Sequence, residues 1–121
     1  MLTILEFGPN ILAYRVEGKL DSADIARAFA EVDERLAASG KIRVYAEVVS
    51  LTGMSVNAVW EDFRKSIEHW DVLPRIEKVA LVTDIEWLRR AARLEDRIFR
   101  RMEMEAYTLA EREEARAWLT S

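Results

Sequence analysis

The sequence has 121 residues, of which 50% are hydrophobic and 33% are charged, so it fits one compact domain, residues 1–121, that buries a core. Its formal net charge of −4 argues against a surface that wraps nucleic acid, because such a surface must be basic, and we expect no nucleic-acid partner. Cysteine is absent, which excludes disulfides, thiolate metal sites and cysteine nucleophiles and fits a reducing cytosol.

The first 40 residues predict a β-hairpin followed by a helix. Strands are expected over Leu2–Phe7 and Ile11–Glu17, with a Gly-Pro-Asn turn between them. A helix then runs to Gly40, because apolar residues recur at helical spacing after an N-cap at Asp21 or Ser22.

The middle of the chain alternates strands with helices. A third strand is expected in "KIRVYAEVV", residues 41–49, and a second helix over Val56–Trp70, where apolar residues form one stripe. A fourth strand, "KVALV", residues 78–82, has no polar alternation, so it belongs in the middle of a sheet. A third helix is expected from Ile85 to about Arg100.

The last 20 residues predict a short strand and a fourth helix. The segment "MEMEAYT" alternates apolar residues with glutamates, and a capping box of Thr108 and Glu111 precedes "REEARAWL". The order of elements is therefore strand, strand and helix, followed by three strand-helix repeats. It predicts an α/β fold with a five-stranded mixed sheet and four helices, in which only the N-terminal hairpin must be antiparallel.

Two carboxylates lie near the ends of predicted neighbouring strands. Glu47 is near the end of the third strand and Asp84 follows the fourth, so together they could hold a cation or transfer a proton. The simpler interpretation is that Asp84 caps the helix that begins at Ile85. His69 is the only histidine, and no motif joins these groups. We therefore expect no enzyme activity, no catalytic residue, no metal and no cofactor.

The third predicted helix carries a wider apolar arc than packing on a sheet requires. Trp87 begins a second apolar stripe beside the first, and arginines fill the remaining face. This pattern is typical of a helix that lies on an anionic membrane, although a core helix with solvated or paired arginines is the alternative. With the second helix it provides the following candidate ligand- or membrane-binding residues: Trp60, Phe63, Ile67, Trp87, Ala91, Leu94, Ile98, Arg90 and Arg97.

Five strings that together span nearly the whole chain resemble the SpoIIAA-like family of the STAS fold. They are "VEGKLDSADI", "GKIRVYAEV", "AVWEDFRKSIEH", "KVALVTDIEW" and "EEARAWL". The resemblance implies a small bacterial cytosolic domain without established enzyme activity, which binds apolar or lipid-like ligands and associates with membrane surfaces. It also implies that the second and third helices are the mobile part.

The loop after the third strand departs from a related group of proteins. Anti-sigma-factor antagonists carry an Asp-Ser-Ser-Gly-like sequence there, with a serine that is phosphorylated, whereas this chain has "VSLTGMSVNAVW". Ser55 lies in the right region without the motif, and it or Asn57 can instead cap the second helix. Because they lie in the same region as that phosphorylated serine, Thr52 and Ser55 are nevertheless the candidates for a switch loop.

These observations favour a non-enzymatic binding module for an apolar small molecule or lipid. The second and third helices would separate to admit the ligand or to contact an anionic membrane. The start "MLTILEFGPN" has no signal-peptide pattern, so we expect the protein in the cytoplasm, with a peripheral fraction at the inner membrane face. The surplus apolar surface also fits a homodimer. The alternative function is a STAS-type regulatory switch that binds a protein partner through the 52–57 loop.

Overall fold

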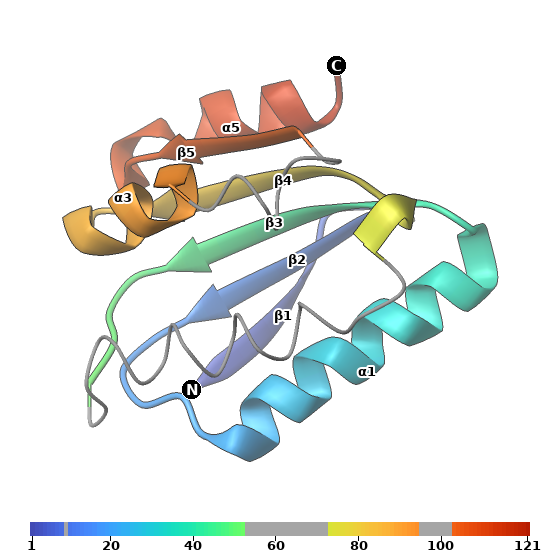
Figure 1. Cartoon of the computed structure of the whole chain (residues 1–121), viewed down its shortest axis with the longest axis horizontal. Coiled ribbons are helices and arrows are strands. Elements are labelled where there is room, and N and C mark those ends of the chain that lie inside the picture. Colours follow the sequence, from blue (N-terminus) through green and yellow to red (C-terminus); the bar gives the residue numbers. More distant parts are fainter. Residues whose placement is uncertain (9, 53–72, 95–102) are drawn as a thin grey trace.

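A computed structural model describes residues 1–8, 10–52, 73–94 and 103–121, and Figure 1 shows how their elements are arranged. Among these residues, no helix is long and apolar enough to cross a membrane. The elements in chain order are β1 (Leu2–Glu6), β2 (Ile11–Val16), α1 (Ser22–Ser39), β3 (Ile42–Val48), η1 (Leu73–Arg75), β4 (Ile76–Thr83), α3 (Glu86–Leu94), β5 (Glu103–Tyr107), η2 (Leu109–Glu111) and α5 (Arg112–Leu119).

The five strands form one sheet in the order β1-β2-β3-β4-β5. β1 pairs with β2 in antiparallel orientation, whereas β2, β3, β4 and β5 pair with one another in parallel. The predicted five-stranded mixed sheet with an N-terminal hairpin is therefore confirmed. Because β2 to β5 are parallel, their carboxyl ends lie along one edge of the sheet, where α/β domains tend to place their binding sites.

The hydrophobic core is divided between the two faces of the sheet. On one face, Leu12 of β2 belongs to a cluster with Leu36 of α1. On the other face, Tyr45 of β3 and Val82 of β4 belong to a cluster with Leu119 of α5. Figure 1 shows α1 alongside β1 and β2, and α5 beside β4 and β5. A strand covered on both faces has no polar alternation, which explains the apolar sequence of β4.

Local capping fixes the two ends of α1 and the start of the C-terminal helical segment. The Asp24 amide donates to Asp21 Oδ1 over 2.9 Å, so Asp21 is the N-cap. The Gly40 amide donates to Leu36 O at the other end, with φ at 81°. The predicted capping box is also present, since the Thr108 amide donates to Glu111 Oε1 over 2.8 Å.

The helices differ from the prediction in number and in their ends. The described residues contain three α-helices, not four, because the helix expected over 56–70 and the end of the third helix, 95–100, lie outside them. α3 begins at Glu86, one residue later than expected. β4 begins two residues earlier than the "KVALV" segment, because Ile76 is buried and pairs with Ile42 of β3.

Candidate functional site

Two loops at the carboxyl edge of the sheet are bonded to each other. The Gly18 amide, after β2, donates to Ser50 O over 3.1 Å and to Ser50 Oγ over 2.8 Å. The Thr52 amide, after β3, donates back to Gly18 O over 2.9 Å, and Lys19 and Thr52 form a short parallel bridge. These reciprocal bonds extend the pairing of β2 and β3 beyond the sheet and hold Thr52 beside the start of α1.

Gly18 allows the two loops to approach one another. Its φ is 75°, in the left-handed region that a side chain disfavours. A Cβ at this position would lie 3.8 Å from Thr52 Oγ1, which is ordinary contact, so the backbone angle rather than space favours glycine. This backbone angle is therefore a local determinant of where Thr52 lies.

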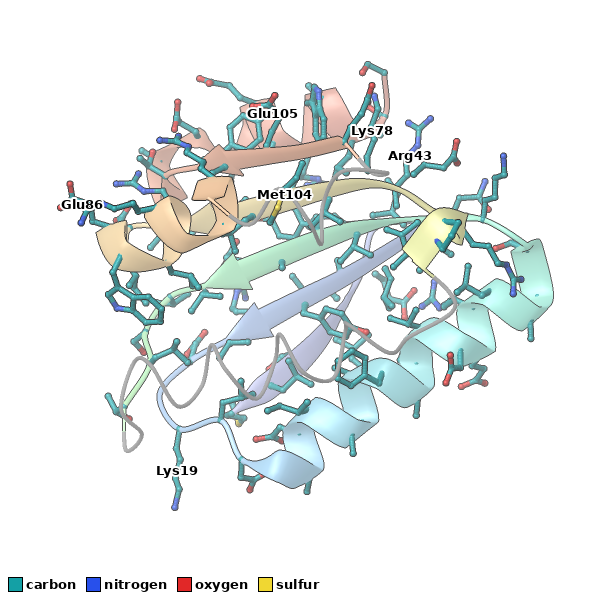
Figure 2. All side chains as sticks on the ribbon, in the orientation of Figure 1. Lys19, Arg43, Lys78, Glu86, Met104 and Glu105 are labelled. Atoms are coloured by element: carbon teal, nitrogen blue, oxygen red, sulfur yellow. The ribbon has the colours of Figure 1, made fainter. Side chains whose placement is uncertain are left out.

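Three residues of the joined loops are exposed to solvent. Thr52 and Lys19 are exposed, and Figure 2 shows Lys19 pointing away from the ribbon. Val49, the residue that follows β3, is 36% exposed, whereas most large aliphatic side chains in the described part of the chain are less exposed. We call Lys19, Val49 and Thr52 the loop surface. It combines a cation, an apolar group and a hydroxyl on a backbone that is held by hydrogen bonds.

Glu47 is a buried carboxylate beside this edge, on the face that carries α5. Its side chain is 1% exposed, and each oxygen has a strong donor. Oε2 accepts from Arg15 Nε over 2.6 Å, and Oε1 accepts from Arg112 Nε over 2.8 Å and from the Tyr45 hydroxyl over 2.6 Å. The two arginines come from β2 and α5, so the carboxylate links three elements that are distant in sequence.

These contacts determine the charge state of the cluster. Burial raises the pKa of Glu47, but hydrogen bonds from Arg112, Tyr45 and Arg15 outweigh burial and hold the pKa below its ordinary value. Burial, followed by the hydrogen bond to Glu47, raises the pKa of Tyr45. Near neutral pH the cluster therefore contains an ionised Glu47, a neutral Tyr45 and two guanidinium cations.

Asp84 has a different role from the one the sequence predicts. Its Oδ1 accepts from the amide of Leu109 over 3.0 Å, at the start of the C-terminal helical segment. The Ile85 amide, ahead of α3, donates instead to Thr83 Oγ1 over 3.1 Å. The prediction that Asp84 caps its own helix is therefore wrong, because its Oδ1 bonds the C-terminal helical segment and because Ile85, not Asp84, directly precedes α3. Both oxygens of Glu47 also accept hydrogen bonds from protein donors. Glu47 and Asp84 therefore do not form the pair of available carboxylates that could hold a cation or transfer a proton.

Only part of the predicted α3 surface can be placed. Trp87 is half-buried, and Arg90 is exposed and pairs with Glu86 over 3.7 Å. Ile85 and Leu88 pack against the core cluster on the α1 face, as expected for the first apolar stripe. Ala91 and Leu94 belong to α3, but their side chains are not described. The other predicted residues lie outside the described residues: Trp60, Phe63, Ile67, Ile98, Arg97, Ser55 and His69.

The sequence interpretation missed Arg15 and Arg112, the partners of Glu47. One signal was present, because a glutamate between the apolar residues Ala46 and Val48 of a predicted inner strand requires a nearby cation if it is buried. The sequence did not identify which arginine, since Arg112 is 65 positions away.

Comparisons with known proteins agree on the fold. The model of the SpoIIAA-like family matches residues 11–120. A similar solved structure is that of an uncharacterized protein from the DUF3478 family of Shewanella loihica PV-4, which has a SpoIIAA-like fold. The two chains share 23% identity with a TM-score of 0.69, over 98% of this chain and 93% of the other. No curated protein matches the chain.

Proposed function

Because the chain belongs to the SpoIIAA-like family, we propose that it is a non-enzymatic regulatory module that binds another protein through the loop surface. The observation that carries this proposal is the reciprocal bonding of Gly18 with Ser50 and Thr52. It holds the loop surface at the carboxyl edge of parallel strands, where α/β domains commonly bind their partners.

The composition of the loop surface suits a protein partner. Exposed Val49 offers an apolar contact, whereas Lys19 and Thr52 offer polar contacts at its border, as in many protein interfaces. Because the backbone is already fixed, binding costs less conformational entropy than binding by an unbonded loop. Thr52 of the loop surface also begins the 52–57 segment, which lies where the related anti-sigma-factor antagonists carry their phosphorylated loop, although their motif is absent here.

Site-specific cross-linking in cells tests this proposal. A photo-reactive phenylalanine analogue replaces Thr52 in one variant and Glu77, at the opposite end of the sheet, in a control. We expect a discrete cross-linked protein from position 52 only, and we expect Val49→Asp in the same chain to remove it. An equal yield from both positions, or a yield unaffected by the Val49 substitution, contradicts the proposal.

A second candidate function is binding of a lipid or another apolar ligand by α3, at the cytoplasmic face of the membrane. The observation that favours it is the half-buried Trp87 on a helix whose exposed side carries Arg90 and Arg93. Such a helix can place its aromatic group in a membrane interface and its arginines on anionic headgroups.

Vesicle sedimentation tests the second candidate. We expect the chain to sediment with phosphatidylglycerol vesicles at low salt and not with phosphatidylcholine vesicles, because the arginines need anionic lipid. The double variant Arg90→Glu, Arg93→Glu should lose this binding, while the cross-link from position 52 remains. If the natural sequence and the double variant sediment equally with phosphatidylglycerol vesicles, or if neither sediments, this function is excluded.

A further inference from the structure

The face of the sheet that carries α5 has a part that no described helix covers. α5 packs on β3, β4 and β5, so β1 and β2 lie beyond it on this face. Leu5 of β1 and Phe7, which follows β1, are only partly buried there. The Phe7 ring lies 4.7 Å from the ring of Tyr45, between centroids, which holds it against the sheet.

Three arginines border these apolar side chains, and each is already held in place. Arg15 and Arg112 are anchored through their Nε atoms to buried Glu47. The guanidinium of Arg116 lies 4.2 Å above the ring of Phe7. We call Arg15, Arg112 and Arg116, with Leu5 and Phe7, the arginine strip.

The anchored arginines keep donors for another ligand. Arg15 and Arg112 are 38% and 45% exposed, and the Nη groups of Arg15 have no hydrogen-bond partner in the described part of the chain. Both oxygens of Glu47 already accept hydrogen bonds, so Glu47 does not offer a further acceptor to the Nη groups of Arg15. Asp84, the other carboxylate near Arg112, is engaged by the Leu109 amide. The three arginines and these two carboxylates together carry one positive charge, on a chain of net charge −4.

We infer that the arginine strip binds an acidic peptide segment of a partner protein. An apolar side chain of the peptide would lie on Leu5 and Phe7, and carboxylates on either side of it would accept from Arg15 and Arg112 at one end and from Arg116 at the other. Arginine forks bind carboxylates with two parallel hydrogen bonds, which a lysine cannot do. Arg112 and Arg116 are one helical turn apart, about 6 Å, which fits successive carboxylates of a peptide.

The pre-ordering of the arginines strengthens the inference. A surface arginine normally loses side-chain entropy when it binds, but the Nε bonds and the ring contact already restrict these three side chains. The negative net charge of the whole chain also opposes non-specific attraction of an acidic peptide, so binding depends on the strip itself. The strip is separate from the loop surface, and the inference stands whether or not the loop surface binds a partner.

Fluorescence anisotropy with a labelled synthetic peptide of Glu-Ser-Glu-Ser-Leu-Ser repeats, in which the glutamates and the leucine share one face of the extended peptide, tests the inference on the whole chain. We expect saturable binding that weakens as salt is raised, because exposed charges are screened. Arg116→Glu should weaken binding by about tenfold or more through reversal of one contact. Lys41→Glu, the same charge change at an exposed position before β3, should leave the affinity within about twofold, because its charge lies outside the strip.

A second variant and two competitors complete the test. Arg15→Lys keeps the charge but loses the fork, so it should weaken binding by several-fold even if Arg116→Glu were poorly folded. Equal affinity for the peptide with glutamine in place of glutamate overturns the inference, as does equal weakening by Arg116→Glu and Lys41→Glu. Displacement of the peptide by inorganic phosphate at an ionic strength at which sodium chloride leaves it bound also overturns the inference, by assigning the strip to phosphate. Binding of phosphatidylglycerol vesicles that Arg116→Glu abolishes overturns it as well, by assigning the strip to a membrane.

Discussion

The Nε of Arg112 donates to Oε1 of Glu47 over 2.8 Å and so ties α5 to the middle of the sheet. α5 has only eight residues, with Ala115 and Leu119 as its buried anchors, so apolar contact alone gives it a small interface. At its other end, the ammonium of Lys78 donates to the carbonyl of Trp118 over 3.2 Å (Figure 2). Charged groups therefore hold α5 at both ends, and the arginine strip lies along its border.

Replacement of Glu47 by alanine should lower the free energy of unfolding by about 2–4 kcal/mol, because the buried hydroxyl of Tyr45 and both arginines lose their acceptor. Urea unfolding followed by circular dichroism measures the change. Glu105→Ala is the matched control, since Glu105 is exposed on β5, and it should change stability by less than about 0.5 kcal/mol. A Glu47→Ala protein as stable as the control would contradict a stabilising role for the cluster.

Glu47 should also make the stability depend on pH in the acid range. Its pKa is lower in the folded chain than in the unfolded chain, so its contribution is complete above the unfolded value of about 4.3. As the pH falls below that value, the unfolded chain takes up the proton first, and the contribution is lost as the pH passes through the folded pKa. In urea titrations from pH 6 to about pH 3, Glu47→Gln should therefore lose less stability than the natural sequence. Parallel curves for the two proteins would contradict the lowered pKa.

The hydroxyl group of Thr83 should contribute more to stability than the shape of its side chain. Its side chain is 0% exposed, and its Oγ1 donates to Val48 O over 2.7 Å and accepts from the Ile85 amide. Thr83→Val keeps the shape but removes the bond to the buried Val48 carbonyl and the acceptor of the partly buried Ile85 amide, which should cost about 1–3 kcal/mol. Thr83→Ser keeps the hydroxyl and should retain more of the stability in the same urea experiment. If serine were the more damaging change, packing of the methyl group would be the dominant effect.

Local sequence patterns predicted the sheet and its caps but not the contacts between distant elements. The unalternating β4, the hairpin and the Thr108–Glu111 capping box each depend on residues a few positions apart, and all three are present. Asp84 was misassigned because an aspartate after a strand usually caps the next helix, whereas its partner, the Leu109 amide, is 25 positions away. Arg15 and Arg112, the partners of Glu47, were not predicted for the same reason, because they lie 32 and 65 positions away from it.

The role of Asp84 can be tested at the level of single amides. Asp84→Ala should accelerate hydrogen exchange of the Leu109 amide and cost about 1 kcal/mol, the usual value for loss of a capping side chain. The amides of α3 should exchange at unchanged rates, because Asp84 Oδ1 accepts from the Leu109 amide, outside that helix. NMR-detected exchange distinguishes the two helices. If exchange became faster in α3 and did not change at Leu109, the prediction from sequence that Asp84 caps its own helix would be correct after all.

The loop surface should depend on the backbone angle of Gly18. Gly18→Ala and Gly40→Ala are matched, because both residues have positive φ, 75° and 81°, and an added Cβ has room at both. Each should cost about 1 kcal/mol through left-handed strain, measured by urea unfolding. Only Gly18→Ala should also reduce the cross-link from position 52, since Gly18 bonds directly to Thr52 and Gly40 ends α1 at the other end of the sheet. Loss of the cross-link in both variants would mean that the yield follows overall stability, and the position of the loop would then not be what the partner recognises.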